Sequence, residues 1–158
     1  MSTAPLTNDT GTASMTLVRK IRARPEIVFD ALIRPEQIMQ WWGPDSGPVL
    51  FAETDPRPGG QWRVRFRMEN GDEEESFGTY LEFARPRSIV MSWRWLSTID
   101  WESRVEISLR PIDIGTELTF THARLRNEEV AAGHERGWSG SLAKLVALFE
   151  AAEEKTDD

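Results

Sequence analysis

The sequence predicts an α+β fold in which a strongly curved antiparallel sheet wraps around one long C-terminal helix. Two patterns predict it: strand-like segments of alternating polarity, joined by turn signals, fill the middle of the chain, and an amphipathic segment of helical period ends it. An antiparallel sheet needs one covered face, and only the C-terminal helix is large enough to cover it. The 158 residues are enough for one domain.

The chain begins with a strand and two short helices. Residues 1–14 are rich in Thr, Ser, Asn and Gly, so we expect a disordered N-terminal tail before a first strand over Met15–Arg22. Pro25 and Pro35 each predict the start of a short helix, because proline fits the first helical position and interrupts a helix elsewhere. The second helix should end near Trp42, before a Gly–Pro pair.

The central strands alternate in polarity. After a strand over residues 49–53, one apolar face is formed by Trp62, Val64, Phe66 and Met68, with arginines between them. Asn70-Gly71 is typical of a two-residue hairpin loop, which would pair Arg67 with Glu74. The same register places Phe77 opposite Val64 on the inner apolar face. The arginines then form a solvated outer row that glutamates partly neutralise.

Three further strands complete the predicted sheet of about seven. Pro86 ends the strand of Phe77, and the next two strands have inner faces of Ile89, Met91, Trp93 and Trp95, and of Trp101, Ser103, Val105, Ile107 and Leu109. A turn over residues 113–115 pairs Leu109 with Leu118 in the last strand. This pairing places His122 opposite Val105 and diagonal to Ser103, so the imidazole and the hydroxyl should lie together on the inner face.

Asn127 predicts the start of the long helix, which should end near Glu153. Residues 15–153 then form a single domain, followed by an acidic C-terminal tail over residues 154–158. The helix has an apolar stripe of Trp138, Leu142, Leu145 and Phe149. A neighbouring face carries Gly133, Gly137 and Gly140. Either a backbone or a ligand comes close to these glycines, or the first half of the helix is soft.

Composition and charge exclude several classes of protein. The chain has no cysteine, which excludes disulfides, thiol nucleophiles and thiolate metal sites, and two histidines cannot build a three-histidine metal site. With 19 basic and 26 acidic residues, the net charge of −7 disfavours nucleic acid and anionic membranes as partners. Neither a signal peptide nor a long apolar run is apparent, so we expect a cytoplasmic protein.

Seven short motifs occur in order along nearly the whole chain, from Met15 to Ala152. They are Arg24-Pro-Glu-Ile-Val-Phe29, Trp41-Trp-Gly-Pro44, Arg57-Pro-Gly-Gly-Gln-Trp62, Gly78-Thr-Tyr80, Arg85-Pro-Arg-Ser-Ile-Val-Met-Ser-Trp93, Gly115-Thr-Glu-Leu-Thr-Phe-Thr-His122 and His134-Glu-Arg-Gly-Trp138. In these motifs the chain resembles the bacterial relatives of the activator of heat-shock-protein-90 ATPase, in the START-like (SRPBCC) helix-grip superfamily. The resemblance implies a seven-stranded sheet gripping the C-terminal helix, an apolar cavity and no shared catalytic residue.

Seven tryptophans against one tyrosine are the unusual feature of the composition. Most take the inner parity of their strands, which favours an aromatic cavity, with a tightly packed core as the alternative. Trp41 and Trp42 follow the second short helix, at the mouth of the cavity in the family's architecture, where we expect one of the pair to pack inward and the other to gate entry. We therefore expect a ligand site formed by Trp41, Trp42, Trp62, Phe66, Phe77, Met91, Trp93, Trp101, Ser103, His122, His134 and Trp138.

Three functional hypotheses follow. The first, which we favour over an enzyme, is binding of a small hydrophobic or aromatic molecule between sheet and helix, without a cofactor or a metal. The second is a cyclase- or hydrolase-type enzyme that acts noncovalently through His122 and His134, the two catalytic candidates; structural histidines are the alternative. The third, by analogy of fold alone, is a chaperone-cofactor-like interaction protein. A homodimer is possible, since homodimers are the commonest soluble oligomers.

Overall fold

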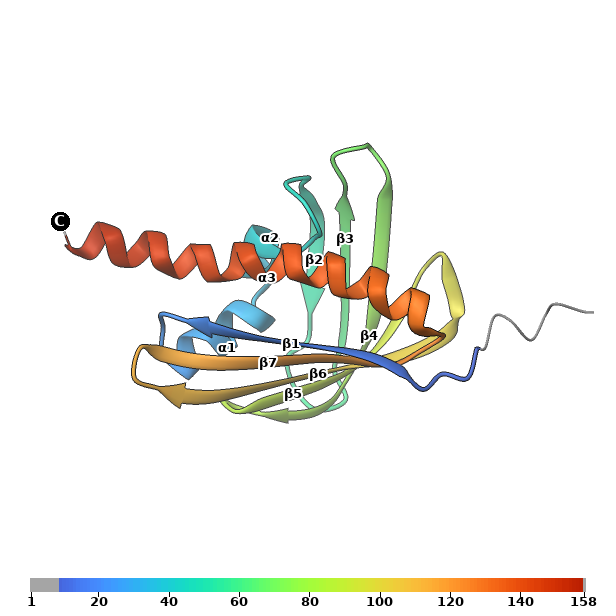
Figure 1. The fold of residues 1–158 in the computed structure, drawn as a ribbon, viewed down its shortest axis with the longest axis horizontal. Coiled ribbons are helices and arrows are strands. Elements are labelled where there is room, and N and C mark those ends of the chain that lie inside the picture. Colours follow the sequence, from blue (N-terminus) through green and yellow to red (C-terminus); the bar gives the residue numbers. More distant parts are fainter. Residues whose placement is uncertain (1–8, 158) are drawn as a thin grey trace, which may run out of the picture.

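The computed structural model describes residues 9–157, with side chains up to Glu150. Within this range seven strands form one antiparallel sheet in the order β1-β7-β6-β5-β4-β3-β2. The strands are β1 (Ala13–Ile21), β2 (Val49–Thr54), β3 (Gln61–Arg67), β4 (Glu73–Ala84), β5 (Ser88–Trp95), β6 (Thr98–Ile112) and β7 (Gly115–Leu125), and the helices are α1 (Pro25–Ile33), α2 (Pro35–Trp41) and α3 (Glu128–Asp157). In Figure 1, β1 and β7 run along α3 while β2 and β3 cross behind it. The predicted curved sheet around a long C-terminal helix is confirmed.

The helices begin where proline and asparagine predict. Pro25 and Pro35 lie in the first turns of α1 and α2. The side-chain oxygen of Asn127 accepts a hydrogen bond at 2.9 Å from the backbone N–H three residues later, which caps α3. The Trp41 indole N–H donates to the carbonyl of Ala31 at 2.9 Å, so it ties α2 to α1.

The apolar stripe of α3 closes the core. Trp138, Leu142 and Leu145 are buried, and Phe149 packs partly buried against the same cluster. The helix contacts β1, β7 and α2. Because the stripe repeats every three to four residues, one side of α3 meets the sheet over several turns while its other side remains in water.

The β3–β4 hairpin has a longer loop than predicted. Met68 and Asp72 pair around three loop residues, with the Met68 N–H donating to the Asp72 carbonyl at 2.8 Å. Gly71 adopts a φ of +97° at the end of this loop, a conformation that glycine takes without strain. Arg67 therefore lies opposite Glu73, one residue earlier than predicted. Since side chains alternate, the shift moves every β4 side chain next to the hairpin to the other face.

The register shift exchanges the two faces of β4. Phe77 lies opposite Arg63 on the outer face, so the prediction that it faces the cavity is wrong. Glu74 lies opposite the buried Phe66 and takes the inner face instead. The Glu74 carboxylate, predicted among the outer arginines, thus lies on the inner face. The Phe77 ring, predicted on the inner face, lies on the outer face.

The outer row of arginines is confirmed, although its partners differ from the predicted ones. Glu73 accepts hydrogen bonds from Arg65 and Arg67 at 2.9–3.2 Å. Glu75 accepts from Arg63 and Arg65 at 3.0 and 3.2 Å. The arginine hydrogen bonds lower the pKa of the Glu73 carboxyl. These pairs cover the convex face of β3 and β4 with matched charge.

The ends of the domain differ slightly from the prediction. β1 begins at Ala13, two residues before the predicted start, because Ala13 still pairs with Leu125 across a register irregularity. α3 continues past the predicted end near Glu153, as Ala, Glu and Lys favour helix. Of the predicted disordered tail, residues 1–8 lie outside the described residues. None of the helices described here has an apolar stretch able to span a membrane.

Candidate functional site

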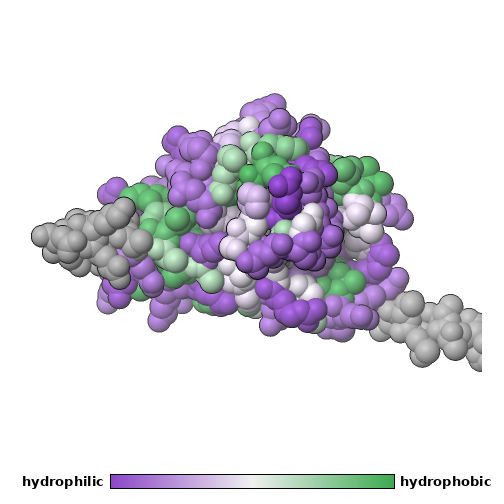
Figure 2. Space-filling view, turned by 90° about the horizontal axis from the view of Figure 1, so that it is seen from above, coloured by the Kyte–Doolittle hydropathy of each residue, from purple (hydrophilic) through white to green (hydrophobic). Residues whose placement is uncertain are grey.

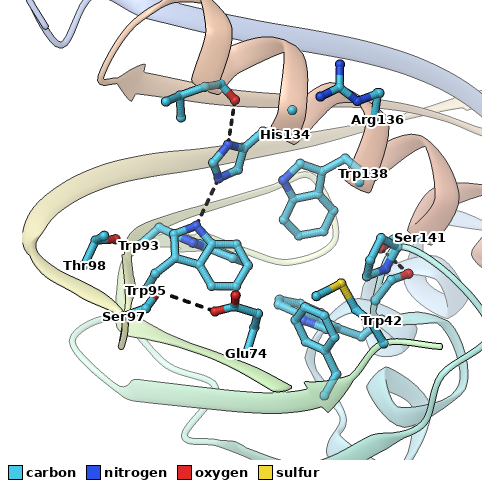
Figure 3. Close-up of a pocket in the computed structure, with 17 residues that line it drawn as sticks. Trp42, Glu74, Trp93, Trp95, Ser97, Thr98, His134, Arg136, Trp138 and Ser141 are labelled. Atoms are coloured by element: carbon cyan, nitrogen blue, oxygen red, sulfur yellow. Dashed lines mark hydrogen bonds between the residues drawn. The ribbon is translucent and has the colours of Figure 1, made fainter. Parts of the chain in front are cut away.

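A pocket of about 680 Å³ lies between α3 and the inner face of the sheet. Its walls come from the loop after α2, from β3 and β4, from the β5–β6 hairpin and from the first half of α3. Figure 3 shows Trp42, Trp95 and Trp138 on three sides of it. The lining residues are Trp42, Gly43, Pro44, Phe66, Met68, Glu74, Trp93, Trp95, Ser97, Thr98, Val130, Gly133, His134, Arg136, Gly137, Trp138 and Ser141.

Indole rings pack on one another at the inner wall of the pocket. Trp42 stacks on Trp93 with ring centroids 5.5 Å apart and planes 10° apart. Trp138 meets both rings edge-on at 5.4 and 5.3 Å. Trp62 packs against Trp93 at 5.0 Å. Such pairs each add about 0.5–1.5 kcal/mol beyond their buried area, so the wall is held in one arrangement.

The loop after α2 is fastened to α3. The Ser141 hydroxyl donates to the Gly43 carbonyl at 2.8 Å, and the Lys144 ammonium donates to the carbonyls of Trp42 and Asp45. Burial lowers the pKa of Lys144. These bonds hold Trp42 in place beside α3, and so position one wall of the pocket.

The glycine face of α3 serves this contact and the pocket. A Cβ on Gly140 would lie 2.1 Å from the carbonyl oxygen of Pro44, so the loop backbone occupies that space. Gly137 and Gly133 line the pocket, and a Cβ on either would meet other atoms only at 3.7–3.8 Å. Of the two explanations for the glycines, close backbone approach is confirmed at Gly140.

His134 lies in the pocket wall as a neutral hydrogen-bonded ring. Its Nε2 lies 3.0 Å from the Trp95 indole nitrogen, whose N–H can only donate. Its Nδ1 lies 2.9 Å from the Val130 carbonyl, which can only accept, so we assign the proton to Nδ1. Burial lowers the pKa of His134. Both ring nitrogens are therefore used within the protein.

His122 is fully buried behind the pocket and has the opposite tautomer. Its Nδ1 accepts the Trp138 indole N–H at 3.1 Å, and its Nε2–H donates to the Ser103 hydroxyl at 2.7 Å. Burial, and then the neighbouring His134 ring, lower the pKa of His122 well below its ordinary value. The predicted pairing of His122 with Ser103 is confirmed, but neither of its ring nitrogens is free to act on a ligand.

Five of the twelve residues predicted for the site line the pocket: Trp42, Phe66, Trp93, His134 and Trp138. Five lie in the buried layer around it: Trp41, Trp62, Met91, Ser103 and His122. Of the pair expected at the mouth, Trp41 is the one that packs inward: its exposed fraction is 1% and it bonds to α1. Two residues, Phe77 and Trp101, lie elsewhere.

Trp101 lies on β6 beyond Arg104, the last residue that pairs with β7, and its indole bonds to the end of β7 instead of lining the pocket. The register shifts between Trp93 and Trp95, and Trp101 packs away from the pocket. Its indole N–H donates to the Arg124 carbonyl at 3.0 Å, and the Arg126 guanidinium lies 4.8 Å from its ring centroid. Trp101 therefore covers the start of the domain rather than a ligand.

Glu74, Trp95, Ser97 and Thr98 are among the lining residues that the predicted site lacks. The predicted two-residue loop gave the wrong hairpin register and placed Glu74 on the outer face. A three-residue loop pairs Glu74 with Phe66 and places it on the inner face. Ser97 and Thr98 lie in the β5–β6 turn, where strand parity gives no orientation. Trp95 has the inner parity of Trp93, and this pattern alone could have added it to the site.

The pocket offers apolar and aromatic surface with few polar groups. In the part of the chain that the structure describes, no three histidine, aspartate or glutamate side chains are placed to share a metal ion. Seen from above the view of Figure 1, the surface is mainly hydrophilic and its hydrophobic residues form separate patches (Figure 2). On that face, apolar side chains do not gather into one continuous docking surface.

Comparisons with known proteins agree with this architecture. No curated protein matches the chain in sequence. An AHSA1 protein from Silicibacter pomeroyi is 29% identical, with a TM-score of 0.77 over 90% of this chain and 99% of that one. A protein from Chromobacterium violaceum is 26% identical, with a TM-score of 0.79 over 87% and 96%. An AHSA1-like protein from Aeromonas hydrophila, at 20% identity and a TM-score of 0.74 over 89% and 94%, shares the fold.

The sequence profile of one family covers most of the domain. The profile is that of the activator of Hsp90 ATPase homolog 1-like proteins, and it matches residues 22–150. The matched range begins just after β1 and ends at the last described side chain of α3, so it includes every wall of the pocket. The chain therefore belongs to the activator of Hsp90 ATPase homolog 1-like family.

Proposed function

We propose that the protein binds a small, largely apolar molecule in the pocket between α3 and the sheet. The observation that carries the proposal is the pocket itself, about 680 Å³ in volume with four indole rings in its lining. Ligand sites usually measure about 300–1,000 Å³ and combine apolar walls with a few polar groups. The family fold is consistent with such a role.

Rigid walls support binding over simple core packing. The indole N–H of Trp95 donates to His134 and that of Trp138 donates to His122, which holds each ring in one orientation. Trp42 is held by the loop that Ser141 and Lys144 fasten to α3. A site whose side chains are already ordered loses less conformational entropy when a ligand binds.

The same contacts give His122 and His134 a structural role. Acid–base catalysis needs a ring nitrogen within reach of the substrate. In both rings one nitrogen accepts an indole N–H and the other donates within the protein. The geometry therefore supports binding rather than proton transfer by these two residues.

Titration calorimetry with naphthylmethanol, flavone and dodecanol tests the proposal. At about a hundredfold excess over Kd, a bound probe should raise the melting temperature by about 5–10 °C. Gly133→Leu should fill the pocket and weaken binding about tenfold or more, while replacing a helical glycine keeps or raises stability.

Ala132→Leu is the matched control, because Ala132 is exposed on the same turn of α3 and does not line the pocket. This variant should bind the probes as the unmodified protein does. Absence of binding by all three probes, or equal binding by the Gly133→Leu variant, would refute the proposed site.

A further inference from the structure

Glu74 is the one carboxylate among the residues that line the pocket. It lies on β4 between two glutamates that the outer arginines already neutralise, Glu73 and Glu75. Because strand side chains alternate, Glu74 takes the inner face and receives none of these arginines. The hairpin register thus brings one negative charge to an otherwise aromatic pocket.

This carboxylate lacks a cationic partner within the described part of the chain. Its hydrogen-bond contact is with the Ser97 hydroxyl at 3.4 Å, which is long for an O–H···O bond. The side chain is partly buried. The contact with Ser97 is exposed to solvent, so a positive group that comes beside Glu74 forms a new ion pair and displaces none of the existing ones.

Aromatic faces surround the place where such a positive group would lie. Figure 3 shows the Glu74 carboxylate beside the Trp95 indole, with Trp42 across the pocket. Indole faces attract ammonium groups, and more strongly where water is excluded. A carboxylate next to several indoles therefore favours an organic cation over a neutral ligand of the same shape.

We propose that the pocket takes an organic cation, an apolar or aromatic molecule with one ammonium group that pairs with Glu74 against the Trp95 ring. This inference rests on the proposed function and names its ligand class. The net charge of −7 attracts cations over a longer range. Arg136 also lines the pocket, but its side chain is exposed, so its charge is largely screened by water.

Three probes with one ring body and different head groups test the ligand class. By titration calorimetry, naphthylmethylammonium should bind about tenfold tighter than naphthylmethanol, and naphthoate should bind weakest. Glu74→Gln keeps the size of the side chain and removes the charge. It should abolish the preference for the ammonium while leaving the Kd of the alcohol unchanged.

Glu135→Gln is the matched control, because it removes one charge from an exposed position on α3 outside the pocket lining. The ammonium preference should persist in this variant. If the alcohol binds as tightly as the ammonium, or if Glu135→Gln erases the preference equally, the cation proposal is wrong while the binding function stands. If none of the three probes binds, the proposed function itself fails.

Discussion

Adding one methyl group to α3 should have opposite effects at Gly140 and at Gly133. At Gly140 the new Cβ would lie 2.1 Å from the carbonyl oxygen of Pro44 and 2.9 Å from its carbon. This carbonyl belongs to backbone, in a loop that Ser141 and Lys144 hold to the helix, so it cannot turn aside as a side chain would. At Gly133 the Cβ would meet only the end of Arg136, at 3.7 Å.

Both substitutions gain the helix propensity of alanine over glycine, but only Gly140→Ala overpacks against a fixed backbone. Alanine in place of glycine inside a helix stabilises by about 0.5–1 kcal/mol. Overpacking against a fixed neighbour costs about 1–3 kcal/mol. Gly133→Ala should therefore gain about 0.5–1 kcal/mol, and Gly140→Ala should lose about 1–2 kcal/mol in net free energy of unfolding.

Thermal and urea unfolding measure both effects. At about 2–4 °C per kcal/mol for a chain of this size, Gly133→Ala should raise the melting temperature by about 1–4 °C and Gly140→Ala should lower it by about 2–8 °C. The comparison is internal, because both variants make the same chemical change in the same helix. If Gly140→Ala is as stable as the unmodified protein, the close approach of the Pro44 backbone to α3 is not present in solution.

Two other predictions concern the histidines and the hairpin. Since the pKa values of His122 and His134 are lowered on folding, the unfolded chain binds more protons below about pH 6.5. The free energy of unfolding in urea should therefore decrease as the pH is lowered from about 7.5 to 5.5. The decrease should be less steep in His134→Gln. A free energy of unfolding that does not change with pH would contradict the buried neutral rings. Gly71→Ala, at a φ of +97°, should cost about 1–2 kcal/mol in the same assay, whereas an unchanged midpoint would contradict the left-handed backbone at Gly71.

The elements of this fold follow from local chemistry that the sequence displays. Pro25 and Pro35 begin the two short helices, and Asn127 caps the third. The pairing of Leu109 with Leu118 is confirmed, and with it the position of His122 opposite Val105. Each of these features depends on residues close in sequence or on a single well-defined turn, so the pattern of the chain was sufficient.

The contents of the pocket depend on details that local patterns do not determine. Asn70-Gly71 fits both a two-residue and a three-residue loop. A two-residue type I′ turn needs a positive φ at both residues, whereas here Gly71 has one and Asn70 does not. That choice exchanges Phe77 for Glu74 on the inner face. One loop residue thus decides whether the pocket carries a negative charge, and with it the kind of ligand that the site favours.

Two of the tryptophans use the histidines between α3 and the sheet as hydrogen-bond acceptors. Among the described residues, the buried indole N–H groups of Trp62 and Trp93 have no acceptor, whereas those of Trp95 and Trp138 have one. His134 accepts from Trp95 and His122 accepts from Trp138, each through a nitrogen that must stay unprotonated. An imidazolium would present a second donor to the indole, so protonation opposes the same contacts that orient the wall. Lowering the pH should therefore weaken the packing of the pocket wall and the stability of the fold together, because the two indole–histidine hydrogen bonds contribute to both.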